Sequence, residues 1–112
     1  MPPGGEPRAR AFYVEALGLR EVAKPADLAA RGGCWFERGG VRVHLGVEPD
    51  FRAARKAHPA FAVQDLDALL ARCRACGAET SGVDAAVRAG ERRAYVDDPF
   101  GNRIELVERT AG

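Results

Sequence analysis

The sequence has few of the residues on which several classes of small protein depend. Its 112 residues include only three cysteines, Cys34, Cys73 and Cys76. An odd number without framework spacing argues against a secreted disulfide scaffold, and one Cys-x-x-Cys pair cannot fill a structural zinc site. No stretch approaches the roughly 20 apolar residues of a membrane span, and the first residues lack the basic and apolar regions of a signal peptide. We therefore expect a cytoplasmic protein without a membrane partner.

An excess of charge of one sign is also lacking. The chain carries 17 basic and 16 acidic residues, a net charge of +1, and its arginines are scattered along the sequence. This balance gives no electrostatic reason to expect a nucleic-acid partner. Hydrophobic residues make up 46% of the chain, so a single domain of this length can build a core without disulfides or an obligatory metal.

What the sequence does contain is a similar order of predicted elements in its two halves. Apolar spacing and turn signals in the first half predict a helix over 7–17 and strands over 20–23, 34–37 and 41–47. In the second half they predict a strand over 59–63, a helix capped by Asp65, a strand over 78–80, a loop over 81–91, and strands over 93–97 and 102–107. This indicates an internal repeat, in which the first half lacks an opening strand because the residues before its helix are rich in Pro and Gly.

Three potential metal ligands lie on predicted strands, each opposite the bulkiest apolar set of its strand. They are His44, His58 and Glu105, and no other histidine occurs in the chain. If the strands curve into one sheet, the three side chains can converge and offer the nitrogen and carboxylate ligands that suit Zn, Mn, Ni or Fe. The alternative is that the histidines are surface or hydrogen-bonded wall residues and Glu105 a solvated charge.

Other side chains on the same faces are candidates for contact with a substrate. Trp35 can provide a stacking wall for a planar ligand, or it can be an ordinary core or dimer-interface residue. Tyr95 and Arg93 can line a cleft. Arg103 can attract an anionic group, or it can be an ordinary solvated surface charge. His44 can be a third ligand or a general base, and no catalytic residue is assigned beyond this alternative.

Three segments resemble a known superfamily, in the order in which the superfamily has them. Residues 95–106, with the turn Asp98-Pro99-Phe100-Gly101, are similar to its closing hairpin. Residues 9–13 with 17–19 resemble its first helix, and residues 58–67 resemble the start of its second module. On these motifs the chain is identified as a member of the glyoxalase, bleomycin-resistance and extradiol-dioxygenase superfamily, the vicinal oxygen chelate proteins.

The resemblance implies an α+β fold. Paired βαβββ modules form a curved, open, barrel-like mixed sheet with helices outside, and here the first strand is missing. It implies one glyoxalase-like domain over 1–112, with module one at 1–47, a linker at 48–57 and module two at 58–108. Members usually pair modules within or between chains, so we expect a homodimer.

The resemblance also implies roles for the candidate ligands. His58 matches the opening-strand ligand of module two, and Glu105 matches its closing-strand ligand. His44 lies where some members place a carboxylate at the end of module one. The remaining ligand belongs to the absent first strand, which leads to the hypothesis that Met1 is an internal methionine. A site without that ligand is expected to bind metal weakly or not at all.

The function implied is that of a protein built around a divalent metal site (Zn, Mn, Ni or Fe) that chelates vicinal oxygens of a small substrate. A metal-dependent lyase, isomerase or dioxygenase would fit this description. Two alternatives stay open: a metal-free protein that binds and sequesters a drug or metabolite, and an inactive, truncated member. The sequence identifies neither the substrate nor the reaction.

Overall fold

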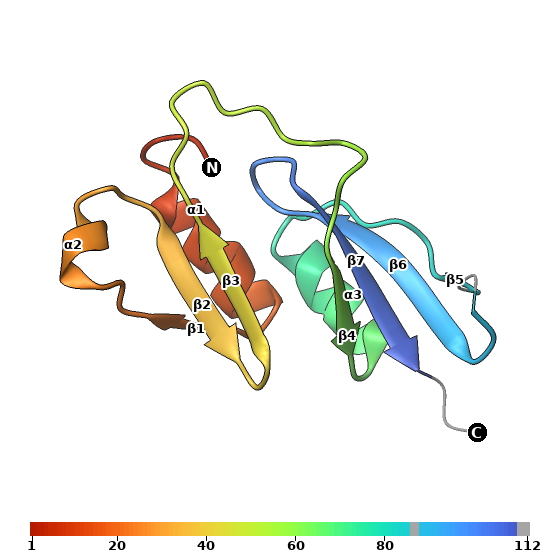
Figure 1. Ribbon diagram of the computed structural model, residues 1–112. Coiled ribbons are helices and arrows are strands. Elements are labelled where there is room, and N and C mark those ends of the chain that lie inside the picture. The colour runs from red at the N-terminus through yellow and green to blue at the C-terminus, as the bar shows by residue number, and fades with distance from the viewer. Residues whose placement is uncertain (86–87, 110–112) are drawn as a thin grey trace. The chain divides into compact units, whose positions relative to one another are not determined.

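The computed structural model describes residues 1–85 and 88–109, which fall into two compact units, Met1–Arg52 and Ala53–Gly112. Each unit combines helix with β-sheet, so the predicted α+β class is confirmed (Figure 1). Among the described residues, no helix has the length and apolar content needed to cross a bilayer.

The first unit contains a helix followed by a three-stranded antiparallel sheet in the order β1-β2-β3. Its elements are α1 (Glu6–Arg10), η1 (Ala11–Ala16), β1 (Arg20–Val22), α2 (Ala26–Ala29), β2 (Cys34–Arg38) and β3 (Val41–Leu45). The helix predicted over 7–17 is therefore present, although its second half has the wider hydrogen bonding of a π-helix. The short helix α2 was not predicted, because four residues carry no detectable apolar period.

The core of this unit lies between its first helix and one face of its sheet. Phe36 of β2 is fully buried, and its ring stacks on that of Tyr13 with 5.2 Å between centroids. Phe12 packs edge-on against Tyr13. Strand alternation then leaves Trp35 and His44 on the opposite face of the sheet.

The second unit is a four-stranded mixed sheet in the order β4-β7-β6-β5 with one long helix. Its elements are β4 (Ala60–Val63), α3 (Leu66–Ala75), β5 (Asp84–Ala85), β6 (Glu91–Asp97) and β7 (Arg103–Arg109). The strand predicted over 78–80 is wrong, because this segment contributes only an isolated bridge between Thr80 and Val96. The loop predicted over 81–91 contains the two-residue strand β5, which is too short to show a period.

Helix α3 covers one face of this sheet and leaves the other face uncovered within this unit (Figure 1). The buried residues on the covered side are Leu66, Leu69, Leu70 and Cys73 from the helix and Ala94, Val96, Ile104 and Leu106 from the sheet. The alternate residues of β6 and β7, among them Tyr95 and Glu105, point to the face that α3 does not cover.

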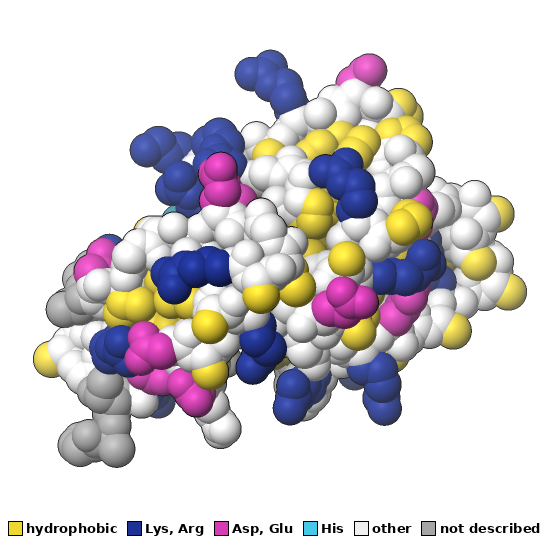
Figure 2. All heavy atoms as spheres, turned by 180° about the vertical axis from the view of Figure 1, so that it is seen from behind, with side chains coloured by type: hydrophobic (Ala, Val, Ile, Leu, Met, Phe, Trp, Pro, Cys, Tyr) yellow, Lys and Arg dark blue, Asp and Glu magenta, His cyan; other side chains and the backbone are white. Residues whose placement is uncertain are grey.

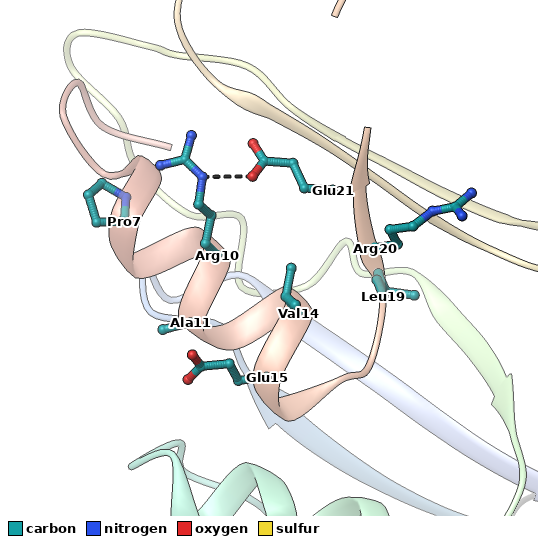
Figure 3. A pocket seen from close by; sticks show the side chains of 8 residues that line it. All are labelled: Pro7, Arg10, Ala11, Val14, Glu15, Leu19, Arg20 and Glu21. Atoms are coloured by element: carbon teal, nitrogen blue, oxygen red, sulfur yellow. Dashed lines mark hydrogen bonds and ion pairs between the residues drawn. The ribbon is translucent and has the colours of Figure 1, made fainter. Parts of the chain in front are cut away.

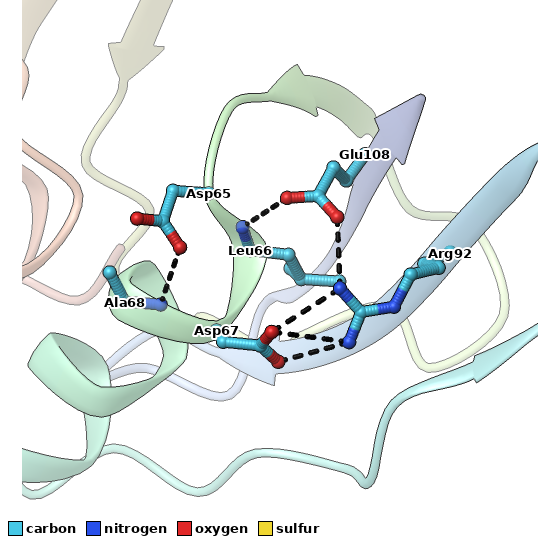
Figure 4. A network of polar contacts seen from close by, with 6 residues as sticks. All are labelled: Asp65, Leu66, Asp67, Ala68, Arg92 and Glu108. Carbon is cyan, nitrogen blue, oxygen red and sulfur yellow. Dashed lines mark hydrogen bonds and ion pairs between the residues drawn. The ribbon is translucent and has the colours of Figure 1, made fainter. Parts of the chain in front are cut away.

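The start of α3 is tied to the sheet by a network of charged groups (Figure 4). Asp65 caps the helix by accepting a hydrogen bond from the backbone N–H of Ala68, at 3.2 Å. The carboxylate of Glu108 accepts one from the backbone N–H of Leu66, at 2.8 Å. Arg92 donates to Glu108 at 2.9 Å and pairs with Asp67, so β6, β7 and α3 are joined at one point.

The described residues before α1 form no strand, as the sequence analysis predicted. In the second unit, β4 pairs in parallel with β7. In the first unit, the backbone of Met1 occupies a comparable place beside the end of β3. Its ammonium group donates to the carbonyl of Gly46 at 2.8 Å, and its carbonyl accepts from the N–H of Glu48 at 2.9 Å. Met1 is only 4% exposed.

Candidate functional site

The face of the second unit's sheet that α3 leaves uncovered carries most of the predicted site residues. Tyr95 of β6 lies opposite Glu105 of β7, and Glu105 lies opposite Ala60 of β4. The backbone N–H of Glu105 donates to the carbonyl of Pro59, which places His58 just before β4 and next to Glu105. Pairing of three strands thus fixes where these side chains meet.

His58 and Glu105 are in direct contact. Nε2 of His58 lies 3.2 Å from Oε1 of Glu105, and the two side chains are only 24% and 17% exposed. On the other side of the imidazole, Nδ1 lies 3.0 Å from the carbonyl oxygen of Lys56. Since a carbonyl can only accept, this contact places a hydrogen on Nδ1. Nε2 then faces the carboxylate either with a second hydrogen or with a free lone pair.

Tyr95 and Arg93 surround this pair. The ring of Tyr95 meets the imidazole of His58 edge-on, with centroids 5.3 Å apart. The guanidinium of Arg93 contacts Asp84 at 3.3 Å and Glu105 at 3.9 Å, and lies over the ring of Tyr95. The hydrogen bond to Asp84, reinforced by neighbouring charges that include Glu105, raises the pKa of Arg93 above its ordinary value.

Arg103 lies over the same tyrosine ring, with its guanidinium carbon 5.2 Å from the ring centroid of Tyr95. Its neighbour across the sheet is Asp97, whose carboxylate pairs with Arg55 at 3.4 Å. The structure therefore gathers His58, Glu105, Tyr95, Arg93 and Arg103 on one sheet face. Sequence reasoning missed Lys56, Arg55 and Asp84, because a backbone carbonyl and exposed charges give no pattern that marks them.

The other two predicted site residues, Trp35 and His44, lie in the first unit. They are partners across β2 and β3, and their rings stack with 3.8 Å between centroids and 5° between planes. Within residues 1–85 and 88–109, no cluster of three or more His, Cys, Asp or Glu is placed to hold a metal ion. His44 is thus engaged with Trp35, and its predicted role as a ligand stays a prediction.

A second feature of the first unit is an open hollow of about 430 Å³ between its first helix and β1 (Figure 3). Its floor is apolar, and it is lined by Pro7, Arg10, Ala11, Val14, Glu15, Leu19, Arg20 and Glu21. Nε of Arg10 contacts the carboxylate of Glu21 at 2.7 Å within it.

Figure 2 shows Lys and Arg side chains at several separate places on one face of the molecule, with acidic side chains near some of them.

Comparison with known proteins identifies the family to which this arrangement of strands belongs. The sequence matches the glyoxalase-like domain family over residues 5–107. The chain belongs to this family. The predicted membership of the glyoxalase and vicinal oxygen chelate superfamily is confirmed. A comparison with curated proteins gave no match.

Solved structures agree with the family. A glyoxalase family protein from Bacillus anthracis is 45% identical, with a TM-score of 0.87 over 98% of this chain and 88% of its own. A glyoxalase family protein from Enterococcus faecalis shares the fold at 23% identity, with a TM-score of 0.71 over 91% of this chain and 87% of its own.

A fosfomycin resistance protein, FosX from Listeria monocytogenes, also shares the fold. At 20% identity its TM-score is 0.75, over 93% of this chain and 83% of its own. That structure is a mutant in complex with Mn(II) and 1S,2S-dihydroxypropylphosphonic acid. At this identity the likeness concerns the fold alone.

Proposed function

We propose that this glyoxalase-like protein binds a divalent metal through His58 and Glu105 and uses it to hold vicinal oxygens of a small substrate. The observation that carries the proposal is the 3.2 Å approach of Nε2 of His58 to Oε1 of Glu105 on a half-buried sheet face. Both atoms are metal ligands of the kind that Zn, Mn, Ni and Fe accept.

The contacts around the pair fit a metal site. Metal-binding histidines usually donate their second ring N–H to a carbonyl or carboxylate, which fixes the ring and its tautomer. Nδ1 of His58 has such a partner in the carbonyl of Lys56. If only Nδ1 carries a hydrogen, the lone pair of Nε2 faces a negative oxygen, and a cation between them removes the repulsion. The alternative is an imidazolium with hydrogen on both nitrogens.

The surrounding residues have separate tasks in this proposal. Arg93 contacts Glu105 and Asp84, so it fixes the orientation of the Glu105 carboxylate. The ring of Tyr95 meets the imidazole of His58 edge-on and limits the rotation of the imidazole. A bound divalent ion would supply Lewis-acid chemistry to the substrate oxygens. That FosX binds Mn(II) with a phosphonate that has two hydroxyl groups makes manganese the first metal to test.

Manganese binding to the purified 112-residue protein tests the proposal, measured by the loss of the free Mn(II) signal in electron paramagnetic resonance. His58→Ala and Glu105→Gln should each weaken binding by about tenfold or more. Glu91→Gln is the matched control, since Glu91 lies on the same strand face four residues from Tyr95, about 13 Å away along the strand. Its affinity should equal that of the wild type.

Thermal unfolding of each variant shows whether it is folded. The proposal fails if the wild type binds no manganese, or if Glu91→Gln loses as much affinity as the two ligand variants. His44→Ala tests the separate prediction that His44 is a ligand, because an effect as large as that of His58→Ala would support that role.

A second function, metal-free sequestration of a planar ligand, is favoured by one observation. The stacked rings of Trp35 and His44 lie on the sheet face opposite the core of the first unit, and His44 is exposed. Aromatic faces of this kind bind flat apolar molecules by stacking. Binding of an aromatic drug that survives removal of metal by a chelator, and is lost in Trp35→Ala, would favour this function over the metal site.

A further inference from the structure

The position of Arg103 next to the proposed ligand pair indicates the chemical class of the substrate. Its guanidinium carbon lies 5.2 Å from the ring centroid of Tyr95, and that ring touches the imidazole of His58. Arg103 is also half-buried and two residues from Glu105 on the same face of β7. Its positive charge therefore stands beside the proposed ligand pair.

Arg93, which lies over the same tyrosine ring, has its charge balanced by carboxylates. Arg93 pairs with Asp84 and Glu105. Asp97, which is the cross-strand neighbour of Arg103, pairs instead with Arg55. Across the ranges 1–85 and 88–109, Arg103 forms no ion pair. A half-buried guanidinium with no counter-charge is suited to receive an anionic group from a ligand.

We propose that Arg103 binds the anionic group, a carboxylate or a phosphonate, of a substrate whose neighbouring oxygen reaches the metal held by His58 and Glu105. This inference rests on the proposed function, since it deepens the description of the same site. A neutral diol that covers the site would exclude water from Arg103 without offering it an anionic partner. Removing an unpaired charge from water costs free energy. The site should therefore prefer small oxyanions to neutral molecules of the same size.

Calorimetric titration of the manganese-loaded protein tests this preference with three probes: glycolate, hydroxymethylphosphonate and ethylene glycol. The wild type should bind at least one of the two anions about tenfold more tightly than the neutral diol, and the two anionic arms show which group it prefers. Arg103→Gln should reduce the preference to that which the metal ion alone gives. Arg109→Gln is the control, because Arg109 lies on the same face of β7 but is exposed and six residues away. It should keep the preference.

Equal affinity of the wild type for all three probes would overturn the inference, and so would an equal loss in Arg103→Gln and Arg109→Gln. The metal site is judged separately, by manganese binding without any probe. If manganese does not bind, nitrogen-15 spectra of the arginine side chains, recorded with methylphosphonate and with acetate, test the anion site alone. A shift of the Arg103 resonance larger than that of the Arg109 resonance would support an anion site at Arg103. Equal shifts of the two resonances would contradict it.

Discussion

The imidazole of His44 lies flat on the indole of Trp35, with 3.8 Å between ring centroids and 5° between planes. The two residues face each other across β2 and β3, and Trp35 is the only tryptophan of the chain. Its fluorescence therefore reports on this one contact. The half-buried indole is shielded from water on the side that the imidazole covers.

Replacing the imidazole should change both fluorescence and stability. His44→Ala removes the cover, so the emission of Trp35 should shift to longer wavelength, and the free energy of unfolding should fall by about 0.5 kcal/mol. His44→Phe is the control, because a second aromatic ring can restore the stacking and keep the emission near that of the wild type. An unchanged spectrum in His44→Ala would show that the two rings are not stacked in solution.

The contact between Glu6 and the loop before β2 predicts a dependence of stability on pH. Oε2 of Glu6 accepts a hydrogen bond from the backbone N–H of Gly33 at 2.9 Å. This bond, with smaller contributions from Arg10 and Lys24, lowers the pKa of Glu6 below its ordinary value of 4.5. Because the folded pKa is the lower one, the stabilisation is present above the unfolded pKa and disappears as the pH falls through the folded value.

Urea unfolding of the wild type and Glu6→Gln at several pH values measures this effect. The wild type should be the more stable protein above pH 5, and the difference should shrink as the pH is lowered toward 3. Glu15→Gln, on the exposed side of η1, should show no comparable trend. A difference between wild type and Glu6→Gln that stays constant with pH would contradict the assigned hydrogen bond.

The network at the start of α3 separates a half-buried carboxylate from an exposed one (Figure 4). Glu108 is 19% exposed and bonds both Arg92 and the backbone N–H of Leu66, whereas Asp67 is 68% exposed and bonds only Arg92. Glu108→Ala should lower the free energy of unfolding by about 1–3 kcal/mol, because it leaves the backbone N–H of Leu66 without its acceptor and removes one of the two carboxylates that pair with Arg92. Asp67→Ala should cost less than about 1 kcal/mol. Equal effects in urea unfolding would contradict this ranking.

The three cysteines should differ sharply in reactivity. Cys76 is exposed, whereas Cys34 and Cys73 are buried. Burial raises the pKa of both buried thiols, that of Cys73 to about 11, and the reactive form is the thiolate. Iodoacetamide at pH 8 should therefore modify one cysteine per chain quickly, as intact mass will show, and Cys76→Ser should abolish this fast step. Rapid modification of two cysteines would mean that the core around Cys34 in the first unit, or the packing of α3 that buries Cys73, is not as described.

The sequence predicted best what depends on a simple period. The alternation of Ala94 and Val96 with Tyr95 assigned each residue to its face, and the same holds for Glu105 between Ile104 and Leu106. The cap at Asp65 and the turn that begins at Asp98 were also recognisable, because a carboxylate in these positions bonds nearby backbone N–H groups.

What could not be predicted are contacts that follow no sequence period, whether the residues are neighbours or far apart in the chain. The bond from His58 to the Lys56 carbonyl depends on the path of an irregular segment. The pairing of Arg55 with Asp97 joins residues 42 positions apart, and it decides which arginine of the site keeps its charge unbalanced. The π-type hydrogen bonding within the predicted first helix and the strand β5 were missed for a different reason, since hydrogen-bond type and two-residue strands leave no mark in apolar spacing.

Gly33 is the position where a single methyl group should damage the fold most. Its φ is +87°, and a Cβ there would lie 2.1 Å from the carbonyl oxygen of Leu45. That oxygen belongs to the backbone of β3, which pairs with β2 next to Gly33, so it cannot move without disturbing the sheet. Gly33→Ala should therefore lower the free energy of unfolding by more than about 3 kcal/mol.

The hairpin glycine Gly40 provides the control, since a Cβ there meets nothing within 4 Å and its φ is not in the left-handed region. Gly40→Ala should change stability by less than about 0.5 kcal/mol. Thermal and urea unfolding of the two variants compare them directly. If Gly33→Ala were as stable as Gly40→Ala, the close approach of Gly33 to the carbonyl oxygen of Leu45 would not exist in solution.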